Sequence, residues 1–351
     1  MQIRDRNKLI RNLLRLMLPL LFLSDVQAQI NIIGTPFIKN YSRSDYQAGQ
    51  QNWSIGQGRE GRLYFANNDG LLEFDGTKWH IYQLPNGIVV RSLYVAPDGK
   101  TYVGGYNEFG FFAPDSLGQL VYHSYNQLLK PEDRNFDEIW RIHHTPDGLV
   151  FQSYKQMIVI KEGEASVIKA PGNFHFSFFV NGQLLLVDLE KGILRYSMGN
   201  FFPLIGTDML TGLEIWAVLP YDNKLLIATA EKGIYIYDGN RLQEWKNQAS
   251  DFLRSNRVFC GTTLGENYFA FGTVLNGILI CNKEGRPVQK INMNKGLQNN
   301  TVLCFFKDIA GNLWAGTDNG IDYIEINSPL SVISYAHGLS AGYAAKLYGG
   351  T

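Results

Sequence analysis

One short phrase recurs along this chain: a turn residue, an apolar run, a second turn with glycine, and another apolar run. It is clearest at Gly311–Ile324, and the same order of residue types occurs at Gly61–Phe74 and Asn223–Tyr237. Repetition on this scale indicates an array of similar supersecondary units rather than one irregular globular fold.

The first turn of the unit occurs seven times, at spacings of 34 to 49 residues. This period fits a blade of four short strands. We therefore predict an all-β chain, folded as a β-propeller of about seven four-stranded blades. The third and fourth units, 136–172 and 173–212, match the phrase least well, so six or eight blades remain open. The turn residues are Gly61, Gly99, Gly148, Gly182, Asn223, Gly265 and Gly311.

The apolar runs are short and rich in β-branched and aromatic residues, which favours strands over helices. Beyond residue 30 we expect little helix, with one short helix within Tyr125–Glu138. We expect Asn31–Ile38 to add a strand beside the last blade, because closing the ring removes exposed sheet edges. The four strands predicted for the first blade are Trp53–Gly56, Leu63–Ala66, Leu71–Phe74 and Trp79–Tyr82.

The N-terminus resembles a secretion signal. Several Arg and Lys residues precede the apolar run Leu16–Leu23, and Val26-Gln27-Ala28 fits the small-x-small cleavage pattern. We therefore predict a signal peptide over residues 1–28, a mature start near Gln29, and an exported, periplasmic protein. The apolar run is too short for a spanning helix, which needs about 20 residues.

We predict that the propeller covers residues 29–336 and that 337–351 begin a further repeat or supply a closing strand. Lys346–Thr351 resembles Asn312–Thr317, which is the strand after the first turn of the seventh unit. We interpret the chain as the N-terminal piece of a longer protein. The alternative is a natural C-terminus that donates a closing strand.

Charge and chemistry exclude several function classes. The 32 basic residues balance the 32 acidic ones, so nothing favours nucleic acid or an anionic membrane as a partner. Gly56–Gly61 matches a dinucleotide-binding pattern but lacks the following helix. With no metal-ligand motif and no nucleophile elbow, we expect neither a cofactor, a metal site nor catalytic residues. Acidic residues recur beside the second turn, which turn chemistry alone explains: Asp69, Glu190, Glu231 and Asp318.

The three cysteines form an odd set for an exported protein. Cys260 and Cys281 fall on strands of one blade that are two strand spacings apart, or about 9.5 Å, too far for a disulfide. We expect Cys260, Cys281 and Cys304 to be small buried hydrophobes. A bridge between Cys260 and Cys304 is the less favoured alternative.

One column of residues opens the innermost strand of each blade, at the predicted mouth of the central channel. Aromatic faces there suit the apolar faces of sugars, and arginine suits acidic groups. The alternative is that these rings pack between blades and never meet solvent. An unpaired core arginine would be costly, so Arg91 should face solvent or have an acidic partner. The predicted ligand-binding residues are Trp53, Arg91, Trp140, Trp216 and Phe259, and Leu303 occupies the same column in the seventh blade.

The segment Lys307–Gly320 resembles the two-component-regulator propeller repeat, typically Asp-x-x-Gly-Asn-Leu-Trp-x-Gly-Thr-x-x-Gly-Leu. The match is looser at Asn67–Leu71 and Asp98–Gly105, and the resemblance covers about residues 50–351. It implies the periplasmic sensor region of a Bacteroidetes-type hybrid two-component system or of a regulator with a triple-tyrosine domain. The family pattern continues with a second propeller, a β-sandwich, a membrane helix and a cytoplasmic output domain, so this chain would sense without itself transmitting.

Three functions follow as hypotheses. The first is a periplasmic ligand-sensing propeller of a signal-transduction receptor, whose ligand the resemblance implies to be an oligosaccharide. The second is an exported propeller enzyme, a glycosidase or a lyase, and the third is a scaffold that binds another exported protein. The partners expected for the first are a carbohydrate and, in the full-length receptor, a second copy of the chain.

Overall fold

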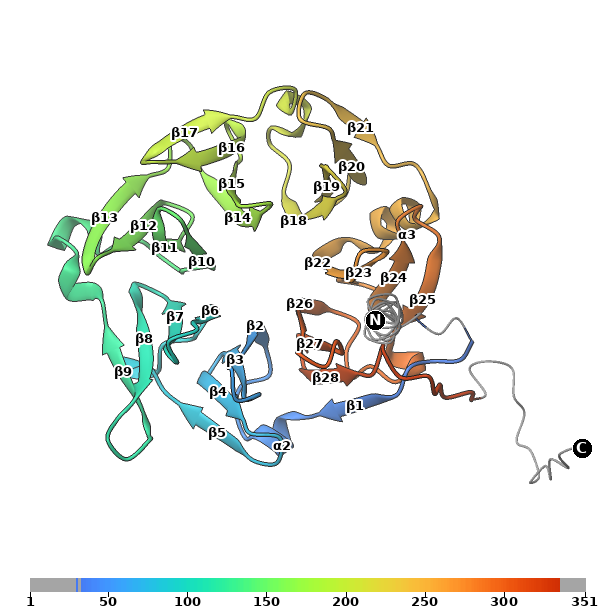
Figure 1. Cartoon of the computed structure of the whole chain (residues 1–351), viewed down its shortest axis with the longest axis horizontal. Coiled ribbons are helices and arrows are strands. Elements are labelled where there is room, and N and C mark those ends of the chain that lie inside the picture. The colour runs from blue at the N-terminus through green and yellow to red at the C-terminus, as the bar shows by residue number, and fades with distance from the viewer. Residues whose placement is uncertain (1–29, 31–32, 335–351) are drawn as a thin grey trace, which may run out of the picture. The chain divides into compact units, whose positions relative to one another are not determined.

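The computed structural model describes residue 30 and residues 33–334. Residues 33–334 belong to one compact unit, Asn31–Thr351. Its strands form seven antiparallel four-stranded sheets. Figure 1 shows these sheets as a ring of blades, with β2, β6, β10, β14, β18, β22 and β26 innermost. The predicted all-β propeller is confirmed, and the open choice of six or eight blades resolves to seven.

Each blade runs from an innermost strand outward. Blade one has β2 (Asn52–Gln57), β3 (Leu63–Asn67), β4 (Gly70–Phe74) and β5 (Trp79–Tyr82). Blade two has β6 (Ser92–Val95), β7 (Thr101–Gly105), β8 (Glu108–Pro114) and β9 (Leu120–Ser124). Blade three has β10 (Arg141–Thr145), β11 (Gly148–Gln152), β12 (Gln156–Lys161) and β13 (Glu164–Lys169).

The degenerate fourth unit still folds as a complete blade. It has β14 (Phe174–Val180), β15 (Gln183–Asp188), β16 (Gly192–Ser197) and β17 (Asn200–Pro203). Blade five has β18 (Ile215–Tyr221), β19 (Lys224–Thr229), β20 (Ile234–Tyr237) and β21 (Leu242–Glu244). Blade six has β22 (Val258–Leu264), β23 (Tyr268–Thr273), β24 (Ile278–Asn282) and β25 (Pro287–Ile291).

The seventh blade is assembled from both ends of the described chain. It has β26 (Val302–Lys307), β27 (Leu313–Thr317) and β28 (Gly320–Ile324), and its outer strand is β1 (Ile38–Tyr41), paired antiparallel with β28. The N-terminal closure was therefore predicted correctly but placed too early, since the strand begins at Ile38. Upstream of it, Thr35 and Val332 form only an isolated bridge.

Helices occupy connections between strands. The predicted helix within Tyr125–Glu138 is wrong in type, because this stretch forms two 3-10 turns, η3 (Asn126–Leu128) and η4 (Pro131–Asp133). A nine-residue helix between blades five and six, α3 (Gln248–Asn256), was not predicted; Asn247 caps it by accepting a hydrogen bond from the Ser250 amide. The remaining short helices are α2 (Arg43–Tyr46), η2 (Pro85–Gly87), η5 (Asp208–Leu210) and η6 (Met293–Lys295).

The core lies between neighbouring blades. The faces of blades one and seven, for example, bury Phe65 and Phe74 against Trp314 and Ile321. Cys260 and Cys281 are also buried, and all three cysteines are free, as predicted. The predicted signal peptide, 1–28, and the predicted further repeat, 337–351, lie outside the described residues.

Candidate functional site

β-Bulges orient the side chains that stand at the start of five innermost strands. In these strands the register shifts by one or more residues just after the strand begins. A bulge adds an unpaired residue and redirects its side chain, and bulges are common beside functional sites. In blades two and three, Arg91 and Trp140 instead lie directly before β6 and β10. The bulged positions hold Trp53, Phe176 (after His175), Trp216, Phe259 and Leu303.

Side chains from these positions form a continuous series of ring contacts. The Trp53 ring meets the Trp140 ring edge-on, with centroids 6.0 Å apart. Trp140 lies 5.8 Å from Phe176. Phe176 lies 5.1 Å from Trp216, which stacks on Phe259 at 4.1 Å. Tyr154 stacks on Trp140 and extends the series. We call these six rings the aromatic collar: Trp53, Trp140, Tyr154, Phe176, Trp216 and Phe259.

The collar spans blades that are not neighbours. Trp53 belongs to blade one and Trp140 to blade three, yet their rings touch. The Trp53 indole N–H donates to Asn68 Oδ1 (2.8 Å), in the turn between the second and third strands of blade one. Trp53, Trp140, Trp216 and Phe259 all remain partly exposed. These rings thus keep some exposure and touch across blades that are not adjacent, whereas the alternative would pack them between blades and away from solvent.

Arg91 joins the collar from blade two. Its guanidinium lies over the rings of Trp53 (4.4 Å) and Trp140 (5.4 Å). Its Nε is 3.3 Å from Glu138 Oε1, so Arg91 has the acidic partner that its position required. Burial raises the pKa of Glu138, and the charge of Arg91 opposes this shift. The structure thus brings together all five residues selected from the sequence.

Polar atoms without a protein partner gather at the same place. The described chain has six buried side-chain nitrogen or oxygen atoms that lack a hydrogen bond. Four belong to this cluster: Arg91 Nη1, Glu138 Oε2, Trp140 Nε1 and His175 Nδ1. Buried polar groups are nearly always paired, because leaving one unpaired costs about 1–3 kcal/mol. Within residues 33–334, the unpaired buried polar atoms are therefore concentrated around the collar.

Two histidines near the collar are uncharged at neutral pH. Burial and the nearby charge of Arg141 lower the pKa of His175 to about 4, and the same two causes lower that of His143 to about 4. His175 lies against Phe176 and Trp216. His143 Nε2 lies 3.0 Å from Ser177 Oγ.

Sequence reasoning missed the contribution of blade four. Phe176 precedes Ser177 as Trp53 precedes Ser54, so aligning the bulges would have found it. Tyr154 comes from the turn after β11 and stacks on Trp140 at 5.4 Å. Leu303, in the same column of blade seven, is buried.

The recurring carboxylates hold turns or neighbouring side chains. Asp318 accepts a hydrogen bond from the Gln51 side chain (2.5 Å), and Glu190 accepts one from Asn173 (2.6 Å). Glu231 lies 3.4 Å from Arg257. Among the described residues, no three His, Cys, Asp or Glu side chains are grouped as metal ligands.

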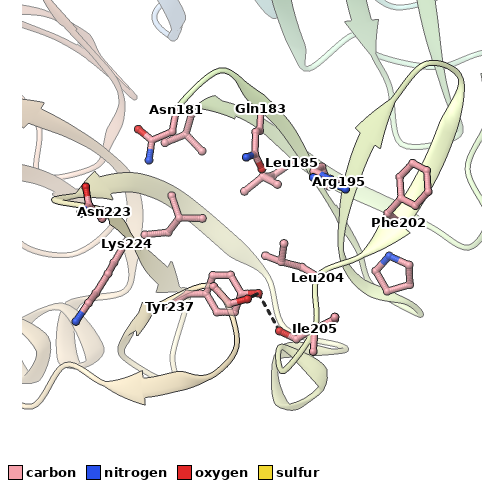
Figure 2. Close-up of a pocket in the computed structure, with 14 residues that line it drawn as sticks. Asn181, Gln183, Leu185, Arg195, Phe202, Leu204, Ile205, Asn223, Lys224 and Tyr237 are labelled. Atoms are coloured by element: carbon pink, nitrogen blue, oxygen red, sulfur yellow. Dashed lines mark hydrogen bonds between the residues drawn. The ribbon is translucent and has the colours of Figure 1, made fainter.

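Clefts between blades lie away from the collar. Figure 2 shows one of about 370 Å³ between blades four and five, with Arg195, Phe202 and Lys224 in its lining. There the Tyr237 hydroxyl donates to the Ile205 carbonyl (2.9 Å). A cleft of about 720 Å³ lies between blades two and three. The residues that line these two clefts include none of the four that carry unpaired buried atoms near the collar. We therefore place the candidate site at the collar, although both clefts are large enough to hold a ligand.

No helix within residues 30 and 33–334 is long and apolar enough to cross a membrane.

The chain resembles sensor domains and lyases in fold. It matches a structure described as the extracellular domain of a hybrid two-component system of B. thetaiotaomicron at 20% identity and TM-score 0.63. The match covers 84% of this chain and 42% of that one. A second, described as the extracellular domain of a one-component system of the same organism, matches at 18% identity and TM-score 0.66, covering 84% and 40%. The chain thus spans about two fifths of the length of these structures.

A propeller enzyme matches over nearly its whole length. Catalytically inactive virginiamycin B lyase from Staphylococcus aureus, in a structure with quinupristin, is 13% identical with TM-score 0.64, covering 82% of this chain and 98% of that one. Identities this low show the fold alone. No curated protein matches this sequence.

The family comparison agrees with the repeat phrase. The family described as Two component regulator propeller matches residues 296–319, which include the clearest copy of the strand after the first turn. The predicted resemblance is therefore confirmed at this repeat: a seven-bladed β-propeller carries, at residues 296–319, a match to the two-component-regulator propeller family.

Proposed function

We propose that this propeller is the ligand-sensing region of an exported signal-transduction receptor, and that an oligosaccharide binds on the aromatic collar. The observation that carries the proposal is the gathering of four unpaired buried polar atoms around partly exposed aromatic rings. Sugars offer apolar ring faces for stacking and hydroxyls that both donate and accept hydrogen bonds. A bound sugar would pair these groups and stack on the indoles at once.

The receptor context supports the same proposal. The similar structures from B. thetaiotaomicron are described as extracellular domains of signalling systems. In our proposal the chain is exported after cleavage near Ala28, its frame continues past Thr351 towards an output domain, and the full-length receptor works as a homodimer. Sequencing the transcript downstream of Thr351 tests the second point, since a stop codon there would contradict it.

The binding site is tested by substitution. Replacing Arg91 and Trp140 with alanine should weaken oligosaccharide binding at least about tenfold, since each stacked ring contributes about 0.5–1.5 kcal/mol beyond burial. Isothermal titration against a panel of neutral and acidic oligosaccharides would measure this, and circular dichroism would show that the fold is kept. The matched control is Phe202→Ala, which removes an exposed ring from the cleft between blades four and five.

Two results would contradict the assignment of the binding site to the collar. If Phe202→Ala abolishes binding while the Arg91 and Trp140 variants bind normally, the ligand lies in the cleft between blades. If both collar variants unfold the protein, the collar is structural core and the ligand must bind elsewhere.

The second candidate is a lyase. The observation that favours it is the match to virginiamycin B lyase over 98% of that enzyme, against about two fifths of the sensor structures. Incubation with quinupristin or with oligosaccharides, followed by mass spectrometry, separates the two. Cleavage that is lost in a His175→Ala variant would favour the lyase, whereas binding without any product favours the sensor.

A further inference from the structure

Arg141 lies beside the collar and points to the class of ligand. It is the first residue of β10, directly after Trp140. Its Nη1 donates to the Trp140 carbonyl oxygen (3.1 Å), and its guanidinium lies 4.0 Å from the centroid of the Phe176 ring. The residue is only partly exposed. These contacts fix the guanidinium but use one of its five N–H groups.

The charge of Arg141 has no counterion within residues 33–334. The ionisable groups that act on it electrostatically are the thiols of Cys304 and Cys260, which come from blades seven and six, and the hydroxyl of Tyr154. Burial raises the pKa of Cys304 to about 12 and also raises that of Tyr154, so these groups are neutral near pH 7. Burial likewise lowers the pKa of Arg141, yet a guanidinium stays protonated in a protein.

Such a charge is unusual in a folded protein. Buried charges are normally paired, because removing an ion from water is costly unless an opposite charge replaces the water. The nearby pair of Arg91 and Glu138 shows the normal arrangement. Arg141 therefore leaves an uncompensated positive charge on the inner side of the collar.

Two of the four unpaired atoms near the collar are donors. Arg91 Nη1 and Trp140 Nε1 can only donate hydrogen bonds, and both lack an acceptor. Glu138 Oε2 can accept, and His175 Nδ1 donates or accepts depending on the tautomer. Glu138 and Glu214 both interact electrostatically with the half-exposed Tyr154. The site therefore offers hydrogen-bond donors and the unpaired positive charge of Arg141, beside carboxylates that can accept from hydroxyls.

We propose that the ligand of the collar is an acidic saccharide whose carboxylate or sulfate group pairs with Arg141. This rests on the proposed function, in which the collar binds a sugar. The sugar hydroxyls meet Glu138 and Tyr154, and the sugar rings stack on the indoles. The planar guanidinium suits both anions, because each can accept two parallel hydrogen bonds from it.

The test uses the full mature protein and three matched disaccharides. Digalacturonate carries carboxylates, a sulfated galactobiose carries sulfate, and galactobiose carries no charge. The variants are Arg141→Gln, Trp140→Ala and the control Arg195→Gln, which removes an exposed arginine that also lies over a phenylalanine, Phe202. Binding is measured by titration calorimetry and thermal unfolding, each at low and high salt.

We expect one charged disaccharide to bind the wild type at least about tenfold more tightly than galactobiose does, with a preference that salt weakens. Arg141→Gln should abolish this preference and Arg195→Gln should keep it. Without ligand, Arg141→Gln should also raise the melting temperature by about 2 °C or more, since it removes an unpaired, partly buried charge. The disaccharide that binds identifies the anion as carboxylate or sulfate.

Three results would overturn the inference. If galactobiose binds as tightly as the charged sugars and Arg141→Gln changes nothing, the ligand is neutral while the collar remains the site. If Arg141→Gln lowers the melting temperature and no charged sugar binds the wild type, Arg141 is structural. If Trp140→Ala leaves every affinity unchanged, the proposed function itself fails and the inference fails with it.

Discussion

Two tryptophans show how differently the same side chain is used in this ring. Trp314, in the seventh blade, is 5% exposed, and its indole N–H donates to Asp308 Oδ2 (3.0 Å). It packs against Tyr41, Phe65 and other rings at the junction of blades one and seven. Trp140, before the third blade, is partly exposed and its indole N–H has no protein partner.

This difference between the two tryptophans distinguishes residues that hold the ring together from residues of the candidate site. Trp314 and Asp308 both belong to Lys307–Gly320, the segment that resembles the family repeat, and this segment supplies a hydrogen-bonded turn and a buried ring. Trp140 lies outside the phrase, in a blade that matches the phrase poorly. We infer that the repeated phrase builds the ring, whereas residues outside the phrase form the candidate ligand site.

The largest expected effect tests this division by stability. Trp314→Ala should destabilise the protein by about 3–5 kcal/mol, because it empties a buried aromatic contact. Trp140→Ala should cost less, since that ring is partly exposed and its N–H is already unpaired. Urea unfolding followed by circular dichroism measures both. Equal losses would show that Trp140 is core in the same sense as Trp314.

A pH titration sharpens the contrast, because the histidines near the collar lie in blades three and four and none lies in the seventh phrase. The folded pKa of His143 and of His175 is about 4, below the ordinary 6.5, so the unfolded chain takes up protons first as the pH falls. Stability should be fully present above about pH 6.5 and fall by up to about 1.4 kcal/mol per pH unit for each histidine towards pH 4.

Replacing each of these two histidines by glutamine should flatten this acid limb. Thermal unfolding between pH 4 and pH 7, in about half-unit steps, would follow the effect. An acid limb that is as steep in the His143→Gln and His175→Gln variants as in the wild type would contradict the assignment of neutral buried histidines.

The smallest expected effect concerns the turns of the seventh phrase. Gly320 has φ +106°, and a Cβ there would lie 2.6 Å from Gln298 Nε2. Gly311 has φ +81°, where a Cβ would meet Asn327. Replacing either with valine should destabilise by about 1–3 kcal/mol in urea unfolding. Gly61→Val is the control for strain alone, because a Cβ there meets nothing within 4 Å; if it costs as much as Gly320→Val, the side-chain clash is irrelevant.

The sequence predicted the ring well because its signals are local. All four strands of blade one were placed within one or two residues, since glycine turns separate short β-branched and aromatic runs there. The column of Trp53, Arg91, Trp140, Trp216 and Phe259 also converges as expected. It did so because its members lie six to eight residues before the first turn of their blades, which places them at a similar height in each blade.

Where the predictions failed, the cause is tertiary. Ile38 and its neighbours pair with β28 only because the ring brings distant segments together, so the exact start of β1 has no local signal. Tyr154 joins the collar from a turn of blade three, which an offset from the first turn does not reveal. Phe176 does have such an offset, six residues before Gly182, but the degenerate fourth unit obscured it. The short α3 helix begins at a capping asparagine, Asn247, that resembles an ordinary loop residue in sequence.

The pairing of β1 with β28 also determines when the seventh blade can form during synthesis of the chain. Asn40 donates to Asp322 Oδ1 (2.6 Å), a partner 282 positions further along the chain. A growing chain therefore carries β1 through the synthesis of all the intervening blades before β28 can pair with it. Contacts of such long range form late and slowly, and a waiting strand edge can pair with another molecule. The seventh blade can therefore be completed only after β28 has been made, and the pairing of β1 with β28 closes the ring.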